Sequence, residues 1–223
     1  MLSKSLFIRG LQCIKSLYLH KKRPYLRDKL SPETLAKFKR GHKVGDLAHD
    51  LFPDGVMIHR GGSKLSEKEK LLVREHISMQ TPVLYEVPFW FNDLICIMDI
   101  VTFSNGKCNA YEVKSSAAIS DTFLWDITFQ AYVIKQFGLD NVDFHIIHLH
   151  KLWDDPSEPN PQELFTIVNV NQEIELKIPA LENMLEEMRT VDEMEQSPDI
   201  AVGDHCRHPY ECDFIGHCWK NII

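Results

Sequence analysis

The feature that most constrains the fold of this chain is a pair of apolar runs joined by an Asn-Gly turn. Residues 95–101 read Ile-Cys-Ile-Met-Asp-Ile-Val, residues 104–106 read Ser-Asn-Gly, and the following run reaches Tyr111 and Glu112. Asn-Gly between apolar runs is a strong signal for a β-hairpin. The hairpin predicts that Asp99 and Glu112 lie on adjacent strands, close enough to share one divalent metal ion.

The residues beside Glu112 are of the types that bind a divalent metal ion and act on a phosphoryl group. Strand alternation places Glu112 and Lys114 on the same face, and a carboxylate such as Asp99 on a buried strand needs a cation or a donor to offset its desolvation. A divalent ion there would polarise a phosphoryl oxygen and lower the pKa of its water, while the lysine orients that water. Glu86, on the preceding strand, either adds a carboxylate or pairs with a basic residue. The alternative for the Glu-Val-Lys triplet is a solvated strand face.

A second pattern lies near the C-terminus, where Cys206, Cys212 and Cys218 follow one another with five residues between them. In a short segment that also holds Pro and Gly, this spacing is typical of metal ligation rather than packing. Cys13 stands alone near the N-terminus. Cys96 and Cys108 are expected to be ordinary core residues, because free cysteine is often buried and the expected compartment is reducing.

With these features together, the chain resembles the PD-(D/E)XK nuclease superfamily, most closely its RecB-like iron–sulfur branch, which includes the CRISPR-adaptation exonucleases. The resemblance implies an α/β fold with a restriction-endonuclease-like central mixed sheet flanked by helices. One domain would span residues 1–223, with the N-terminal helix and residues 200–223 forming a metal-clasped cap. The segments that carry the resemblance are 2–5, 10–13, 45–49, the Asp99/Glu112/Lys114 set, 126–132 and the cysteines.

The resemblance also implies roles for individual residues. It assigns catalysis to Asp99, Glu112, Lys114 and Gln130, and an Mg²⁺ or Mn²⁺ ion to His49, Asp99, Glu112 and Val113. Two positions depart from the family pattern. Met98 stands where the family name implies Pro, and Tyr132 is two residues after Gln130 instead of four, which turns it away from the face of Gln130.

For the cysteines, the resemblance implies a four-iron–four-sulfur (4Fe-4S) cluster held by Cys13, Cys206, Cys212 and Cys218. Relatives commonly have two residues between the first two C-terminal cysteines, whereas this chain has five. Zinc bound by three cysteines and one of His205, His208 or His217 therefore remains an alternative. Three other histidines, at 145, 148 and 150, are expected to be ordinary strand residues rather than zinc ligands.

Charge is distributed unevenly. Residues 1–43 hold twelve Lys and Arg against two acids and so carry a charge of +10. The remaining 180 residues carry −17, which gives the net charge of −7. A basic segment can neutralise backbone phosphates even in an acidic protein, and we expect Lys21, Lys22, Arg23 and Tyr132 to contact DNA. The alternative is that these charges are solvated helix faces.

The expected function is that of an Mg²⁺- or Mn²⁺-dependent deoxyribonuclease, with exonuclease action on single-stranded ends favoured. The alternatives are a catalytically silent nuclease-like module that holds DNA or a partner, and a metal-clasped partner subunit. The resemblance implies a helicase or CRISPR and repair proteins as partners. Because no run of about 18 apolar residues occurs and charges interrupt the N-terminal apolar run, the expected location is the cytoplasm, away from membranes.

Local signals predict the order of the elements. Helices are expected at about 3–22, 31–49, 66–77, 120–137 and 180–195. Strands are expected at 56–58, 82–91, 94–103, 107–114, 142–150 and 164–170, and residues 154–161 are expected to form a loop.

Overall fold

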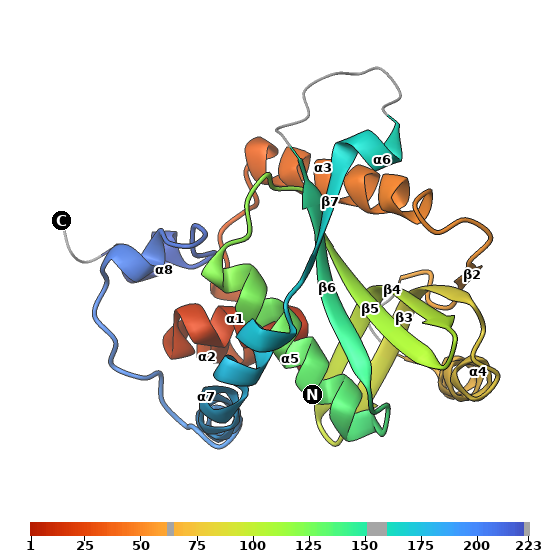
Figure 1. Ribbon diagram of the computed structural model, residues 1–223. Helices are drawn as coiled ribbons and strands as arrows, with labels where there is room; N and C mark the ends of the chain where they lie inside the picture. The colour runs from red at the N-terminus through yellow and green to blue at the C-terminus, as the bar shows by residue number, and fades with distance from the viewer. Residues whose placement is uncertain (62–64, 151–159, 221–223) are drawn as a thin grey trace.

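The computed structural model describes residues 1–61, 65–150 and 160–220 and is built on one mixed sheet (Figure 1). The strand order is β2-β3-β4-β5-β6-β7, and β1 pairs with β4 outside this path. Antiparallel pairs join β3 to β4, β4 to β5 and β6 to β7, while β1/β4, β2/β3 and β5/β6 are parallel. The strands are β1 (Leu2–Ser3), β2 (Val56–Met57), β3 (Val83–Phe91), β4 (Leu94–Ser104), β5 (Lys107–Lys114), β6 (Val142–Leu149) and β7 (Phe165–Asn169).

Helices pack against the sheet, and the buried apolar side chains form two clusters. The helices are α1 (Lys4–Gln12), α2 (Ile14–Lys22), α3 (Pro32–His49), α4 (Glu67–Ser78), α5 (Asp121–Phe137), α6 (Pro161–Leu164), α7 (Asn171–Thr190) and α8 (Ile215–Cys218). The larger cluster joins the sheet to α1, α2, α4, α5 and α7. The smaller cluster contains Val44 and Ala48 of α3 together with side chains of β3 to β7. The expected sheet flanked by helices is therefore present.

The hairpin predicted from Asn-Gly is the join between β4 and β5. Asn105 and Gly106 have φ values of 50° and 74°, the left-handed conformations that the tightest hairpin turns require. Ser104 pairs with Lys107 across the turn, and the ladder runs on to the pair Ile100 and Tyr111. Asp99 and Glu112 take the next register position, as predicted.

Several helix signals are also confirmed. The side chain of Ser31 accepts from Thr34 N at the start of α3, with Pro32 in its first turn. Ser66 and Glu69 form the expected capping box of α4. The helix α5 ends at Gly138, whose φ of 101° is available to glycine without strain.

Two helix predictions were wrong in extent. The helix expected over 3–22 is interrupted at Cys13, whose φ of −167° and ψ of 116° are extended, so this residue lies between α1 and α2 rather than inside one helix. The helix expected from 180 begins earlier, at Asn171. Pro179 lies inside this helix, α7, rather than in its first turn, where proline is most common. The expected loop at 154–161 falls largely outside the described residues.

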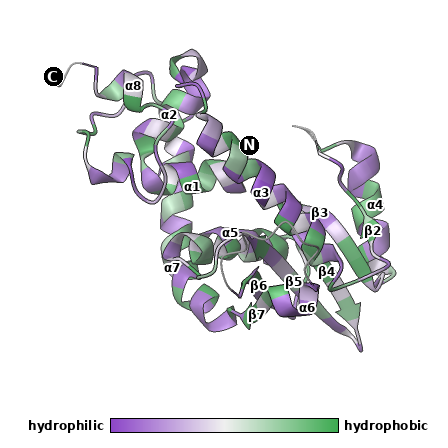
Figure 2. Cartoon of the chain, turned by 90° about the horizontal axis from the view of Figure 1, so that it is seen from above, coloured by the Kyte–Doolittle hydropathy of each residue, from purple (hydrophilic) through white to green (hydrophobic). Residues whose placement is uncertain are grey.

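The hydropathy of the helices agrees with this architecture. Figure 2 shows apolar and polar residues alternating along most helices rather than forming one long apolar stretch. Among the residues that the structure describes, none of the helices is long and apolar enough to cross a membrane.

Candidate active site

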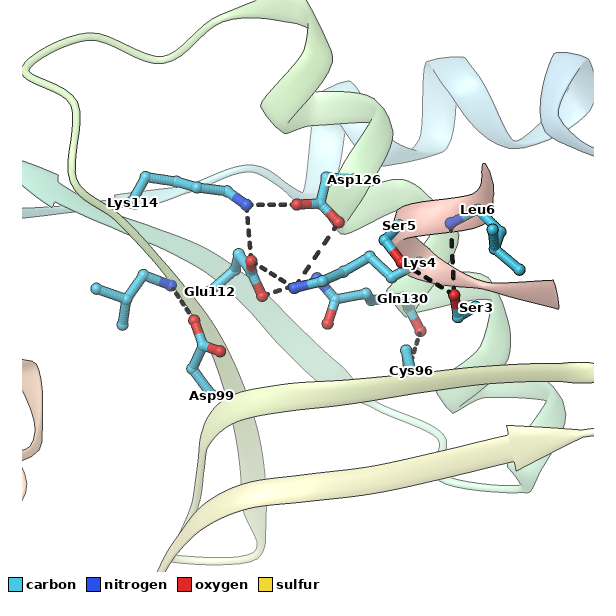
Figure 3. A network of polar contacts seen from close by, with 11 residues as sticks. Ser3, Lys4, Ser5, Leu6, Cys96, Asp99, Glu112, Lys114, Asp126 and Gln130 are labelled. Atoms are coloured by element: carbon cyan, nitrogen blue, oxygen red, sulfur yellow. Dashed lines mark hydrogen bonds and ion pairs between the residues drawn. The ribbon is translucent and has the colours of Figure 1, made fainter. Parts of the chain in front are cut away.

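A buried network of charges centres on Glu112 (Figure 3). Glu112 is 2% exposed. Its Oε1 accepts from Lys4 Nζ at 2.8 Å and from Lys114 Nζ at 2.7 Å, and its Oε2 accepts from Gln130 Nε2 at 2.8 Å. A carboxylate offers about four lone-pair positions. Three of them are filled by the chain itself, which leaves one for an external ligand.

Lys114 is the more firmly held of the two lysines. Its ammonium also pairs with Asp126 Oδ2 and lies 5.1 Å from the ring centroid of Phe123. Lys4 Nζ is 4.0 Å from Asp126 Oδ1, and 28% of its side chain is exposed. Lys114 is therefore contacted on three sides, whereas the side chain of Lys4 bonds Glu112 and is partly exposed to solvent.

The electrostatics of this group keep its members charged. Burial alone would lower the pKa of Lys114, but Asp126 and Glu112 outweigh it and raise that pKa above its usual range. Burial would likewise raise the pKa of Glu112, but Lys114 and Lys4 hold it at about 2. Both ions therefore stay ionised at neutral pH.

Asp99 is in the opposite electrostatic position. Its Oδ2 accepts from Val113 N at 2.7 Å, but no lysine bonds it directly among the described contacts. Burial and the nearby Glu112 raise the pKa of Asp99 to about 8, although Lys4 opposes them. A cation bound beside a buried carboxyl of this kind would lower its pKa and stabilise the charged form.

Glu86 adds a further acid beside Asp99. It lies within strand β3, at the position where the pairing of β3 with β4 is interrupted. It lies at the register position opposite Asp99, between the pairs Tyr85–Ile100 and Val87–Met98. Its φ of 50° is unusual for a non-glycine residue. Leu84 and Val87 both belong to the larger core cluster, although a regular strand would place residues three apart on opposite faces. Strain of this kind concentrates at functional sites.

A divalent ion fits the chemistry of this donor set. The group holds three carboxylates on adjacent strands, and hard cations prefer oxygen ligands. Asp126 Oδ1 and Gln130 Oε1 are buried and have no hydrogen-bond partner among the described residues. As they stand, however, no three His, Cys, Asp or Glu side chains in residues 1–61, 65–150 and 160–220 form a group that could hold a metal ion. Lys4 and Lys114 occupy the space beside Glu112 instead.

The remaining residues predicted for catalysis and metal binding lie at different depths in the site. Gln130 is fully buried on α5 and bonds Glu112, while Tyr132 packs against the larger core cluster. His49 ends α3 and stacks on Tyr85 of β3, with ring centroids 4.1 Å apart. Burial lowers the pKa of His49, which favours its neutral, ligand-competent form.

The basic residues predicted to contact DNA are engaged within the chain. Lys21 Nζ lies 2.8 Å from Asp192 Oδ2, Lys22 Nζ donates to Asp192 O at 2.7 Å, and Arg23 lies over the ring of Tyr18. The network around Glu112 does not include them.

Sequence reasoning missed two members of this network, Lys4 and Asp126. The signal for Asp126 was available, because it stands four residues before Gln130 on the same face of α5. Lys4 had no comparable signal. Its contact with Glu112 spans 108 residues and depends on the short pairing of β1 with β4.

The second candidate site joins the two ends of the chain. Cys13, Cys206, Cys212 and Cys218 line one pocket of about 340 Å³ of empty space, part of it open to solvent. Both views place α8 beside the N-terminal helices (Figures 1 and 2). All six cysteines are free. Burial raises the pKa of Cys13 and of Cys218, and neighbouring thiols add to both shifts.

Ion pairs and hydrogen bonds surround this cysteine pocket. Asp213 Oδ2 pairs with Arg9 and with Arg27, each at 2.6 Å. Gln12 Nε2 donates to the carbonyls of His205 and Tyr210 at 2.7 Å. Four thiols are the ligands that an iron–sulfur cluster or a tetrahedral zinc ion uses, but in the arrangement that the structure describes these cysteines line the pocket without forming a group that could hold a metal ion. His205 also lines the pocket, whereas His208 and His217 are exposed.

Comparison with known proteins places the fold. No family model and no curated protein matches the chain. A solved structure from Eubacterium rectale, described as a "Putative exonuclease", matches with a TM-score of 0.57 and 13% sequence identity. The match covers 94% of this chain and 88% of that one. At this identity the likeness concerns the fold alone, and the chain shares the fold of that bacterial protein.

Proposed function

We propose that the protein is a metal-dependent nuclease that hydrolyses phosphodiester bonds of DNA, acting as an exonuclease on single-stranded ends. The observation that carries this proposal is the arrangement of Asp99, Glu112 and Lys114 on one hairpin. The raised pKa of Asp99 and the remaining lone pair of Glu112 favour binding of a cation beside these acids, next to the fixed ammonium of Lys114 and with a shift of Lys4 away from Glu112. The nuclease-like fold supports the same conclusion.

Asp99 and Glu112 would hold the ion, with Glu86, His49 and the backbone of Val113 nearest to complete its surroundings. A bound Mg²⁺ or Mn²⁺ would supply a polarised phosphoryl oxygen and a water of lowered pKa. Lys114, held by Asp126, orients the attacking water and offsets charge that develops on the phosphate. Gln130 fixes the carboxylate of Glu112 from the opposite side.

Lys4 supplies a second positive charge at the same carboxylate. Phosphoryl transfer depends mainly on positioning and on stabilising negative charge. Because Lys4 is partly exposed and less tightly held than Lys114, it is the cation better placed to reach a substrate phosphate. Asp126 acts through Lys114 and is a positioning residue.

The four thiols would hold a four-iron–four-sulfur cluster, or zinc as the alternative. Its role is structural, since the pocket joins α1 and α2 to the last residues and lies outside the network of Glu112. From the family resemblance, we place the enzyme beside a helicase or among CRISPR and repair proteins.

The test is cleavage of end-labelled single-stranded DNA by the purified holoprotein with Mn²⁺, compared with duplex DNA and RNA. Glu112→Gln keeps the shape of the side chain but removes its charge, and we expect its rate to fall by about 10³-fold or more. Circular dichroism of the variant should match that of the wild type. Wild-type protein that binds DNA and leaves every substrate intact would make it a nuclease-like binding module instead.

A further inference from the structure

The first half of α3 presents apolar side chains to solvent. Leu35 is 47% and Phe38 53% exposed, and the preceding segment adds Tyr25 at 79%. Amphipathic helices normally turn such residues toward the core. In α3 the fully buried residues are Val44 and Ala48, both in the second half. The first half therefore carries an apolar and aromatic surface that the described part of the chain leaves open.

Helical spacing arranges these residues in one outward stripe. Phe38 and Lys39 lie three and four residues after Leu35, and His42 lies four and three residues after them, which places all of them on one face. The same interval continues through Asp46 to His49. At 1.5 Å per residue, the stripe from Leu35 to His49 is about 21 Å long.

The stripe ends at the candidate active site. His49 stacks on Tyr85, the residue before Glu86 in β3. Asp46 lies close enough to Glu86 to contribute to its raised pKa, after burial and Glu112. A strand bound along α3 would therefore lead from the exposed first half of the helix toward the carboxylates.

The charge of this segment identifies its partner. Residues 29–43 contain five basic residues and a single acid, Glu33, in a protein of net charge −7. Lys37 and Lys39 are exposed, on either side of Phe38. Aromatic faces that stack on bases, combined with basic side chains that follow the backbone, are how proteins bind single strands. A protein partner with an apolar groove would favour the apolar residues and gain nothing from the lysines.

We infer that the outward stripe of α3 binds single-stranded DNA, with Phe38 stacking on a base and Lys39 contacting a phosphate. The direction of the strand toward Glu112 rests on the proposed function, whereas the binding itself does not. This assigns DNA contact to α3 rather than to Lys21–Arg23, whose side chains are held by Asp192 and Tyr18.

The experiment measures binding without cleavage. Fluorescence anisotropy of labelled oligothymidine in EDTA gives the Kd of the holoprotein and its variants. Phe38→Ala should weaken binding about 5- to 150-fold, the range expected for one stacked base. Phe38→Tyr should keep wild-type affinity and Phe38→Leu should lose it, because only an aromatic face stacks. Leu71→Ala is the control, since Leu71 is 68% exposed on α4 and its loss should leave Kd unchanged.

Lys39→Glu supplies an independent readout. Loss of one phosphate contact should reduce the slope of log K against log[salt] by about 0.7 for a single strand. Leucine at position 38 binding as well as phenylalanine would overturn the stacking assignment. Tighter binding of duplex than of single strands, or no affinity for DNA, would overturn the inference and leave the stripe to a protein partner.

These results separate the inference from the proposed function. A wild type that cleaves DNA with no effect of Phe38→Ala on Kd would refute the α3 stripe and keep the nuclease. A wild type that binds through Phe38 but cleaves nothing would keep the stripe and refute the nuclease.

Discussion

The network of Glu112 and the cysteine pocket are both built from residues far apart in sequence, yet they are stabilised in opposite ways. Glu112 lies in a sheet strand and bonds two ammonium groups and an amide. The cysteines lie at a helix break and in a C-terminal segment with little regular structure, and their thiols meet across an open pocket. The charges of the Glu112 network are compensated within the network, whereas the four cysteines line their pocket without an ion pair or a disulfide between them.

This difference shows where each site needs an external group. Lys4, Lys114 and Gln130 already bond Glu112, so on the proposed function a metal ion would serve the chemistry of this network rather than its folding. The segment that carries the three C-terminal cysteines is short of regular structure and is tied to the N-terminal residues by individual contacts such as those of Asp213, Gln12 and Asp28, so a group bound by the cysteines would contribute directly to folding, as structural metals do.

The largest expected effect is therefore on the cysteine pocket. Cys13→Ala should remove the bound iron or zinc and lower the unfolding free energy by about 3 kcal/mol or more, which corresponds to about 6–12 °C in Tm for a chain of this length. Metal analysis, visible absorption and thermal unfolding measure it. Cys96→Ala is the matched control, because Cys96 is buried in the core and should leave the metal content unchanged. Full metal retention in Cys13→Ala would limit the site to the C-terminal cysteines and a histidine.

Chelation of metal ions should affect the Glu112 network and the cysteine pocket differently. EDTA should stop cleavage completely while moving Tm by less than Cys13→Ala does, because Lys4 and Lys114 already neutralise Glu112 in the metal-free protein. Activity assays and thermal unfolding of the same samples provide both values. A large fall in Tm with intact iron or zinc would mean that the charged network also depends on its ion for stability.

Lys4 tests whether the charged network uses its own cations in catalysis. Lys4→Met should lower the single-turnover rate about 10²-fold, the usual cost of losing one group that stabilises a developing charge. Its affinity for Mn²⁺, measured by calorimetry, should equal or exceed that of the wild type, because a like charge beside the ion is removed.

Two variants control this experiment. Lys4→Arg should restore part of the rate, and Lys177→Met, which breaks the ion pair with Asp121, should cleave normally. If Mn²⁺ affinity and rate fell together in Lys4→Met, Lys4 would have a structural role only.

The smallest effect concerns Asp99 in the metal-free protein. Its folded pKa of about 8 exceeds the value of about 3.9 expected in the unfolded chain. Between these values the folded state keeps a proton that the unfolded chain has lost, so stability falls as pH rises through the window. Asp99→Asn lacks this proton, and its Tm advantage over the wild type should grow from about pH 5 to about pH 8. A constant difference in EDTA would mean that Asp99 is already ionised at low pH.

The sequence was most informative where local chemistry determines structure. Asn105-Gly106 predicted the hairpin and hence the opposition of Asp99 and Glu112, and Ser66 with Glu69 predicted the start of α4. The role of Lys4 was not predictable, because its contact with Glu112 spans 108 residues, and the sequence around Cys13 holds no proline to signal the break between α1 and α2. The start of α7 was predicted at about 180, whereas the helix begins at Asn171 and contains Pro179, and a proline inside a helix has the same sequence signature as a proline that begins one.

The placement of α1 has a consequence for biosynthesis. This helix begins at Lys4, which contacts Glu112, and ends beside Cys13, and Arg9 within it pairs with Asp213 across 204 positions. A growing chain on the ribosome exposes α1 well before these partners, because Glu112 follows Lys4 by 108 residues and Asp213 follows Arg9 by 204. Contacts of such long separation form slowly. Lys4 can therefore join Glu112 only after β5 has been made, and the contact of Arg9 with Asp213 forms later still, so the buried charges of Glu112 and Lys114 must be in place before α1 is fully anchored.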